Sequence, residues 1–329
     1  MTTVAAVVPH WNRRDLLQTL IASLRGQTHT LDEIIVADNG STDDSAALAE
    51  SLGARVVRLG KNLGFAAAVN RGLEAVRTDW VAIVNNDVTL APDWLETLLA
   101  AAEREGASFA TGKIVRAMDS AIIDGTFDEI SRGACACRCG AGRPDGPLWN
   151  RPRRIRFASM TAALFRSAVF EQVGKLDESF ESYLEDVDFG IRCATLGLDG
   201  IYLPVALARH RGSATLGAWN SDTVRLIARN QILLAAKHFR GQPLWPIVAG
   251  QLLWGALAVR HGTGVAYLRG KIAGWRCRSH VEQSGANRVD SDKDRLRTIF
   301  EASERDIFEL GRQTGFDWYW RAYFWLLLR

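Results

Sequence analysis

The chain has 329 residues, of which 47% are hydrophobic and 23% are charged. This composition excludes a disordered chain and leaves room for a large α/β domain with an appendage. The formal net charge of +3 gives no reason to expect a nucleic-acid partner. The N-terminal apolar run is short and has no basic segment before it, so we expect no secretory signal and a cytoplasmic location. Cys135, Cys137 and Cys139 lack the CxxC spacing of zinc sites, so we expect reduced thiols.

Over the first hundred residues, apolar runs alternate with amphipathic stretches. Strands are predicted at residues 4–8, 34–37, 55–59 and 80–84, and helices at 16–24, 41–49 and 64–76. This alternation is typical of βαβ units and predicts a parallel, twisted sheet. Polar residues follow three of these strands, at residues 10–12, 38–41 and 85–87. Because ligands bind at the carboxyl ends of strands in such sheets, these residues mark a candidate binding site.

The periodic pattern ends near residue 117. Residues 117–154 are rich in Gly, Pro, Arg and Cys, and they are predicted to form a long loop or insertion. An apolar run at 158–165 follows, and helices are predicted at 167–173, 185–197 and 224–239.

The C-terminal third is rich in aromatic and basic residues. An uncharged run at 244–259 is shorter than the roughly 20 residues that a membrane span needs. A basic stretch without acids occupies 260–278, and aromatic residues mixed with arginine occupy 316–326. These segments suit a bilayer interface, and they equally suit a packed helical appendage or an oligomer interface.

Asn85-Asn86-Asp87 stands at the end of the fourth predicted strand. A carboxylate there is well placed to hold a divalent cation that bridges a diphosphate, because hard cations prefer oxygen ligands. The same three residues are also favoured in turns, so a simple turn is the alternative.

Glu185-Asp186-Val187-Asp188 places three carboxylates at the start of a predicted helix. The positive end of the helix dipole would stabilise them without any function. Their apolar neighbours, however, predict partial burial, which is more typical of functional acids. Asp186 or Glu185 could act as a general base, whereas Asp188 could instead cap the helix or pair with Arg192 at the i, i+4 spacing.

His210 follows a strand-like run at 201–203 and could reach the same edge of the sheet as Asp87. A lone histidine is more often structural, although an imidazole is an acceptable ligand for Mn. No GxGxxG or GxxxxGK[ST] motif follows the first strand and no GxSxG is present, which disfavours dinucleotide-binding, P-loop and serine-hydrolase functions.

Seven short motifs occur in the order and spacing of one known family. They are Val8-Pro9-His10-Trp11-Asn12, Asp38-Asn39-Gly40-Ser41-Thr42-Asp43, Asn62-Leu63-Gly64-Phe65-Ala66, Asn85-Asn86-Asp87, Gly174-Lys175-Leu176-Asp177-Glu178-Ser179-Phe180, Glu185-Asp186-Val187-Asp188 and His210. Over about residues 4–238, the chain resembles the family 2 glycosyltransferases with the GT-A fold. It is most similar to the non-processive, rhamnosyltransferase-like bacterial members that build surface polysaccharides.

The resemblance implies an α/β fold with a mostly parallel central sheet flanked by helices. The catalytic domain would span residues 1–215, with a nucleotide-sugar-binding half at 1–115 and an acceptor-binding half at 116–215 that contains a Cys/Arg-rich loop at 132–154. A helical C-terminal extension, which could associate with a membrane, would span 216–329.

The resemblance also implies roles for individual residues. Asp186 would be the general base, assisted by Glu185, and Asp87 and His210 would bind Mn or Mg. Donor-binding residues would be Pro9, Asn12, Asp38, Asn39, Asn62, Gly64, Asn85 and Asn86. Acceptor-binding residues would be Glu185 and Asp188.

The chain departs from the family pattern at three places. Asn85 replaces the first acid of the DxD element, which weakens metal coordination. Met160 stands where relatives usually have glycine and could narrow the acceptor site. The QxxRW motif of processive synthases is missing, which favours transfer of a single sugar.

The expected activity is inverting transfer of one sugar from dTDP-rhamnose or a UDP-sugar to a glycan or polyprenyl-diphosphate-linked acceptor. The enzyme would contact the inner membrane surface from the cytoplasm and could form a homodimer through its C-terminal region. One alternative is a non-catalytic nucleotide- or carbohydrate-binding subunit of an envelope assembly complex, which Asn85 motivates. The other is a nucleotidylyltransferase, which shares the architecture but normally has a Gly-rich basic loop after its first strand.

Overall fold

The computed structural model of the chain describes residues 2–212, 219–283 and 293–327. Its first four long strands form a parallel sheet in the order β3-β2-β1-β4. The strands are β1 (Val4–His10), β2 (Glu33–Asp38), β3 (Arg55–Arg58) and β4 (Trp80–Val84). The helices between them are α1 (Arg14–Arg25), α2 (Ser45–Ser51) and α3 (Phe65–Ala75). The parallel βαβ arrangement predicted for this half is therefore confirmed.

Strand β1 shows why this half is buried on both faces. Val4, Ala6 and Val8 pack into one hydrophobic cluster with residues of α1, whereas Ala5 and Val7 pack into another with residues of α3. Successive side chains of a strand point to opposite faces, so a strand covered on both sides must be apolar at every position. The continuous apolar runs in the sequence reflect this double cover.

The second half of the sheet mixes parallel and antiparallel pairs. Strand β11 (Ala162–Arg166) lies antiparallel between β4 and β6 (Phe109–Arg116), and β12 (Gly200–His210) runs parallel to β6. The short strand β5 (Val88–Leu90), which precedes helix α4 (Trp94–Arg104), pairs with the end of β12. The sheet as a whole is thus mixed, because β11 enters it in the reverse direction.

Residues 117–154 form a folded segment, which corrects the prediction of a long loop. The segment contains β7 (Asp119–Gly125), β8 (Asp128–Ile130), β9 (Ala136–Arg138), the 3-10 helix η1 (Pro147–Trp149) and the start of β10 (Arg153–Ile155). Strands β8 and β9 pair as a separate two-stranded sheet. These strands are too short to show a periodic pattern, and contacts far along the chain hold them. Arg132, for example, lies 2.6 Å from Glu304.

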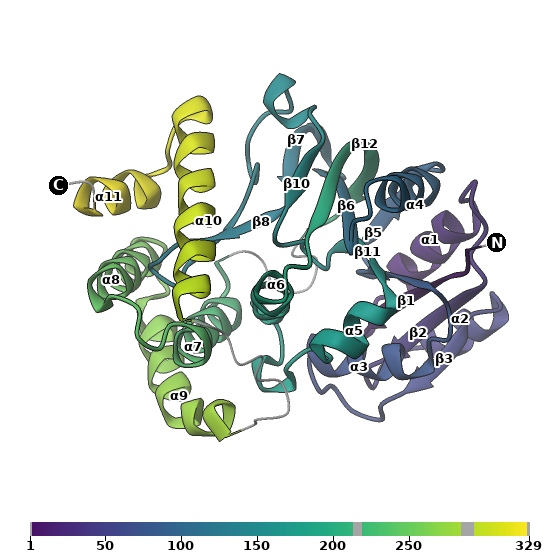
Figure 1. The fold of residues 1–329 in the computed structure, drawn as a ribbon. Coiled ribbons are helices and arrows are strands. Elements are labelled where there is room, and N and C mark those ends of the chain that lie inside the picture. The colour runs from purple at the N-terminus through teal and green to yellow at the C-terminus, as the bar shows by residue number, and fades with distance from the viewer. Residues whose placement is uncertain (1, 213–218, 284–292, 328–329) are drawn as a thin grey trace.

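The remaining elements are mostly helical. They are α5 (Ser167–Val173), the 3-10 helix η2 (Glu178–Phe180), α6 (Glu185–Thr195), α7 (Ser221–His238), α8 (Leu244–Arg260), α9 (Gly264–Gln283), α10 (Lys293–Thr314) and α11 (Trp318–Leu327). Figure 1 shows α7 to α11 gathered on one side of the molecule, away from β1 to β3. A shared core joins Val187 of α6, Leu233 of α7 and Phe300 of α10, so the C-terminal helices pack on the second half of the sheet domain. Within the described ranges, no helix combines the length and apolar character needed to cross a membrane.

Candidate active site

Asp87 and His210 lie next to each other at the edge of the sheet. Strand β12 pairs with β5 so that His210 is opposite Val88, the residue after Asp87. As a result, His210 Nε2 lies 3.1 Å from Asp87 Oδ1. Its other ring nitrogen, Nδ1, lies 2.8 Å from Asp124 Oδ2. The two residues predicted as metal ligands are brought together, and Asp124 of β7 joins them.

The two carboxylates control the charge of this histidine. Burial by itself disfavours the imidazolium, but Asp124 and Asp87 outweigh it and raise the pKa of His210 to about 9. A cation that replaced this proton on Nε2 would leave Nδ1–H donating to Asp124. That is the usual outer-shell arrangement of a histidine ligand, in which a carboxylate orients the ring.

The donor atoms near Asp87 suit a hard cation that keeps open positions for phosphate oxygens. In the parts of the chain that the structure describes, no group of three or more His, Cys, Asp or Glu side chains has the geometry of a metal site. Asn85 Oδ1, however, is buried and has no hydrogen-bond partner among the described residues. An amide oxygen, a carboxylate and an imidazole are acceptable ligands for Mn, and a bound diphosphate would complete the set.

The loops that follow β1, β2 and β3 are tied together by hydrogen bonds of polar side chains. Asn39 Nδ2 donates to Asn62 Oδ1 and to the carbonyl of Gly64, both at 3.0 Å. Asn12 Oδ1 accepts from the Thr42 amide at 2.9 Å. Asp38 accepts from the Ser41 amide at 3.1 Å. Hydrogen bonds therefore hold the predicted donor-binding residues of these loops together beside β1, where Pro9, Asp38 and Asn39 are buried.

His10 links this surface to the Asp87 loop. Its Nδ1 lies 2.9 Å from Asn86 Nδ2, so the ring is neutral and accepts the hydrogen bond with this nitrogen. Burial lowers the pKa of His10 to about 4, in spite of the nearby Asp38 carboxylate. The contact connects the donor-binding loops to Asn86, the residue directly before the candidate metal ligand Asp87.

Glu185 and Asp186 begin α6 after a strained turn, in which Tyr183 and Leu184 both have positive φ. Glu185 is buried, and its Oε2 has no hydrogen-bond partner among the described residues. Burial, reinforced by the Asp186 carboxylate, raises the pKa of Glu185 well above its ordinary value. Burial also raises the pKa of the partly exposed Asp186, against the opposing charge of Arg138. Carboxyl groups with raised pKa values are suited to general acid–base chemistry.

Asp188 does not belong to this site, which corrects its expected role in acceptor binding. Its side chain is 0% exposed. Arg192 lies 3.0 Å from one carboxylate oxygen, and Lys237 and His238 lie 2.9 Å and 2.7 Å from the other. Asp188 therefore anchors α6 to α7, and the pairing with Arg192 that its spacing allowed is confirmed.

Arg138 of β9 reaches the same region, although no sequence motif singled it out. It donates to Thr161 Oγ1 at 2.6 Å and to Ser159 Oγ, and its Nη1 lies 3.4 Å from Asp124 Oδ2. Neither Arg138 nor Asp124 could be found from spacing alone, because both lie in the segment whose pattern predicted a loop. The only signal was the unusual density of arginine and cysteine there.

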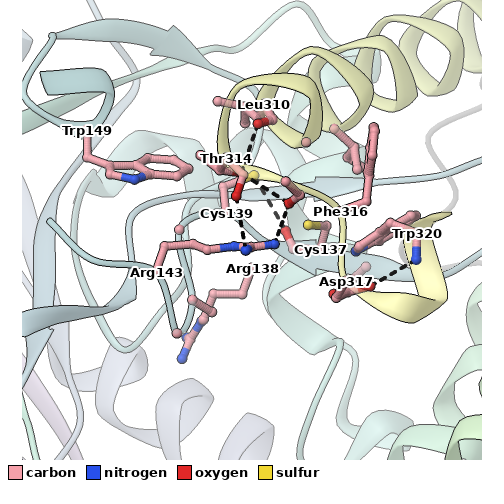
Figure 2. Close-up of a pocket in the computed structure, with 17 residues that line it drawn as sticks. Cys137, Arg138, Cys139, Arg143, Trp149, Leu310, Thr314, Phe316, Asp317 and Trp320 are labelled. Atoms are coloured by element: carbon pink, nitrogen blue, oxygen red, sulfur yellow. Dashed lines mark hydrogen bonds between the residues drawn. The ribbon is translucent and has the colours of Figure 1, made fainter. Parts of the chain in front are cut away.

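A pocket of about 470 Å³ lies between β9, η1 and the connection from α10 to α11 (Figure 2). Trp149, Phe316 and Trp320 line it, and Arg143 donates to the Thr314 carbonyl at 3.1 Å. None of the residues predicted to form the active site lines this pocket. Its wall does include Cys137, which is partly buried, and Cys139; in the described residues all the cysteines are unpaired thiols.

Comparison with known proteins identifies the family. Residues 5–174 match the model of glycosyl transferase family 2. The chain is 30% identical over 275 residues to the N-acetylglucosaminyl-diphospho-decaprenol L-rhamnosyltransferase of Mycobacterium tuberculosis, which covers 74% of this chain and 87% of the relative. It is 28% identical over 269 residues to the pre-mycofactocin glycosyltransferase of the same species. This match covers 80% of this chain and 54% of that relative.

Solved structures agree on the fold. GalNAc-T7 with UDP, GalNAc and Mn²⁺ matches with a TM-score of 0.62 and 14% identity over 78% of this chain and 51% of that one. The mannosyltransferase PcManGT of Pyrobaculum calidifontis, in complex with GDP-Man and Mn²⁺, matches with a TM-score of 0.53 and 15% identity over 97% and 85%. The chain therefore belongs to glycosyl transferase family 2 and has the GT-A fold.

Proposed function

We propose that this glycosyltransferase transfers a single sugar, with inversion and with a divalent metal, from a nucleoside-diphosphate donor to a lipid-linked glycan. The observation that carries the proposal is the Asp87–His210 pair at the end of the strands, with Glu185 and Asp186 at the start of α6. The first pair is suited to a metal and the second to a base. The proposed donor is dTDP-rhamnose or a UDP-sugar, and the proposed acceptor carries a polyprenyl diphosphate. The name of the rhamnosyltransferase relative states an acceptor with a decaprenyl diphosphate and the transfer of rhamnose, and this supports the acceptor and the sugar that we propose.

The proposed reaction uses residues from both halves of the domain. Residues of the half at 1–115, including Asp38, Asn39 and Asn62, would hold the nucleoside. Asp186 would take the proton of the acceptor hydroxyl while the hydroxyl oxygen forms a bond to the anomeric carbon. The bond from that carbon to the diphosphate breaks, and its electron pair stays on the diphosphate. A cation held by Asp87 and His210, Mn or Mg, would neutralise that charge.

The first test is donor binding measured by thermal unfolding. We expect a UDP-sugar or dTDP-rhamnose with Mn²⁺ or Mg²⁺ to stabilise the protein by about 2.7 kcal/mol at 100 times Kd, and EDTA to remove most of this effect. Asp87→Ala should abolish the metal dependence, whereas Asp93→Ala, an exposed acid at the start of α4, should not. Absence of a shift with every nucleotide and metal would contradict the proposal. Slow metal-dependent hydrolysis of the donor would exclude a non-catalytic binding subunit.

We further propose that the C-terminal helices rest on an anionic membrane surface on the cytoplasmic side, where the lipid-linked acceptor is found. Helices α8 and α9 expose large apolar side chains, among them Leu244, Trp245, Leu252, Leu268, Ile272 and Trp275. Exposed arginines accompany them, namely Arg260, Arg269 and Arg276. Lys271 is an exception to the basic stretch, because its Nζ points inward and donates to Gln231 Oε1 at 2.7 Å. Apolar side chains mixed with arginine are typical of helices that lie in a bilayer interface.

Vesicle flotation tests this contact. We expect the protein to float with vesicles that contain an anionic phospholipid, and to do so less at high salt. The double variant Leu252→Glu/Trp275→Glu should lose most of this binding because it places charge in the apolar surface. Val205→Glu, at an exposed apolar position of β12, is the matched control. A salt-insensitive dimer that the same double variant dissociates would instead make this surface a homodimer interface.

A further inference from the structure

Arg138 is fixed in place by the fold around it. Its partner across the β8–β9 hairpin is Asp128, whose Oδ1 lies 3.9 Å from Arg138 Nε. Thr161 and Ser159 both accept from Nη2. Gly125 of β7 leaves room for the side chain, since a Cβ there would lie 2.8 Å from Arg138 Cδ. These contacts thus hold the guanidinium in one position, so it does not move freely on the surface.

That position is beside the candidate metal ligands, because Arg138 Nη1 lies 3.4 Å from Asp124 Oδ2 and the same oxygen lies 2.8 Å from His210 Nδ1. Although burial opposes it, the pKa of Arg138 is raised by four surrounding carboxylates, those of Asp128, Asp124, Asp186 and Asp87. Asp87 belongs to the metal-binding pair and Asp186 is the proposed base. The charge of Arg138 therefore acts on both the metal-binding pair and the proposed base.

The guanidinium also keeps the capacity to bind a ligand. Its side chain is 33% exposed. Among the described residues it makes hydrogen bonds to Asp124, Ser159 and Thr161, and these use three of the five N–H donors of an arginine. The second N–H of Nη1 is left for a phosphate oxygen, whereas Nε faces Asp128, and a hydrogen bond from a charged guanidinium to a phosphate is stronger than one between neutral groups.

We propose that Arg138 binds the donor diphosphate and stabilises the negative charge that develops on it as the sugar leaves. This inference rests on the proposed function. It also explains how the site tolerates Asn85 in place of an acid. With one carboxylate fewer to hold the metal, a fixed guanidinium supplies part of the positive charge that the departing diphosphate needs.

The test compares diphosphate with monophosphate binding. Titration calorimetry would give Kd values for UDP, dTDP, UMP and dTMP, each with MnCl₂ or MgCl₂. We expect Arg138→Met to weaken the diphosphates about 10–100-fold, the monophosphates much less, and to lower kcat of transfer. Arg138→Lys should recover only part of the affinity, because an ammonium has three donors and cannot keep the contacts to Asp124, Ser159 and Thr161 and also bind a phosphate. Arg143→Met, in the same segment but turned to the Thr314 carbonyl, is the matched control and should change neither constant.

The outcomes are distinguishable. Unchanged diphosphate affinity and kcat in Arg138→Met, or equal loss for diphosphates and monophosphates, would overturn the assignment. If Arg138→Met does not fold, Arg138→Gln, a polar side chain that ends two bonds short of Nη2, replaces it, and the same Kd and kcat values decide. Failure of the unaltered protein to bind any nucleotide would refute the proposed function itself and not only the role of Arg138.

Discussion

Asp186→Asn is expected to lower kcat about 10²–10⁴-fold while the Kd of the donor changes little, because the amide keeps the shape of the side chain but cannot take a proton. Glu185 and Asp186 compete for the role of base. Glu185 is buried and its pKa lies well above the ordinary value, which favours its protonated form over the ionised form of a base. Asp186 is more exposed, and the charge of Arg138 favours its ionised form. Single-turnover assays and donor titrations of the same samples measure the two effects.

The pH profile separates the two carboxyl groups. A base works only when ionised, so log(kcat/KM) should fall with a slope of about one as pH drops below its raised pKa. This acid limb should disappear in Asp186→Asn and persist in Glu185→Gln, which we expect to affect mainly the KM of the acceptor. Loss of the limb in Glu185→Gln instead would transfer the role of base to Glu185. Full turnover by Asp186→Asn would refute the mechanism.

The sequence predicted the first half of the fold well because its signals there are local. Continuous apolar runs defined β1, β2 and β4, and the alternation with helices defined their parallel order. The adjacency of Asp87 and His210 was also expected, since both follow strands that end at the same edge of the sheet. Such features depend on short-range patterns that a single sequence displays.

Asp124 and Arg138 could not be predicted, for a physical reason. They lie on short strands whose position depends on distant partners. The Ile130 amide of β8, for example, donates to Ser303 Oγ of α10 at 2.6 Å. A three-residue strand carries no period, so composition alone suggested a loop there. The different roles of Asp186 and Asp188, in contrast, could be predicted from the spacing of the two residues.

Residues 186 and 188 lie about 200° apart on a helix, so Asp186 and Asp188 point to different surroundings.

Asp188→Ala is expected to destabilise the protein by about 3–5 kcal/mol, because it leaves the buried Arg192 without its counter-ion and leaves Lys237 with Asp177 alone. The Arg192 side chain is 1% exposed and that of Lys237 is 6% exposed, and both lie within 3.0 Å of the Asp188 carboxylate. Urea unfolding followed by circular dichroism measures the loss. Asp222→Ala, an exposed acid in the first turn of α7, is the matched control and should change stability by less than about 0.5 kcal/mol.

The loss of stability in Asp188→Ala should depend on pH, and the lowered pKa of Asp188 determines the direction. Burial opposes ionisation of Asp188, but Arg192, Lys237 and His238 outweigh it and hold the pKa of Asp188 far below its ordinary value. A carboxyl group with a lowered pKa in the folded state stabilises the protein above its unfolded-state pKa of about 4, and this contribution is lost as pH falls further. The stability difference between the unaltered protein and Asp188→Ala should therefore be constant above about pH 5 and shrink below pH 4. A variant of normal stability with a raised acceptor KM would instead return Asp188 to the acceptor site, against its burial between α6 and α7.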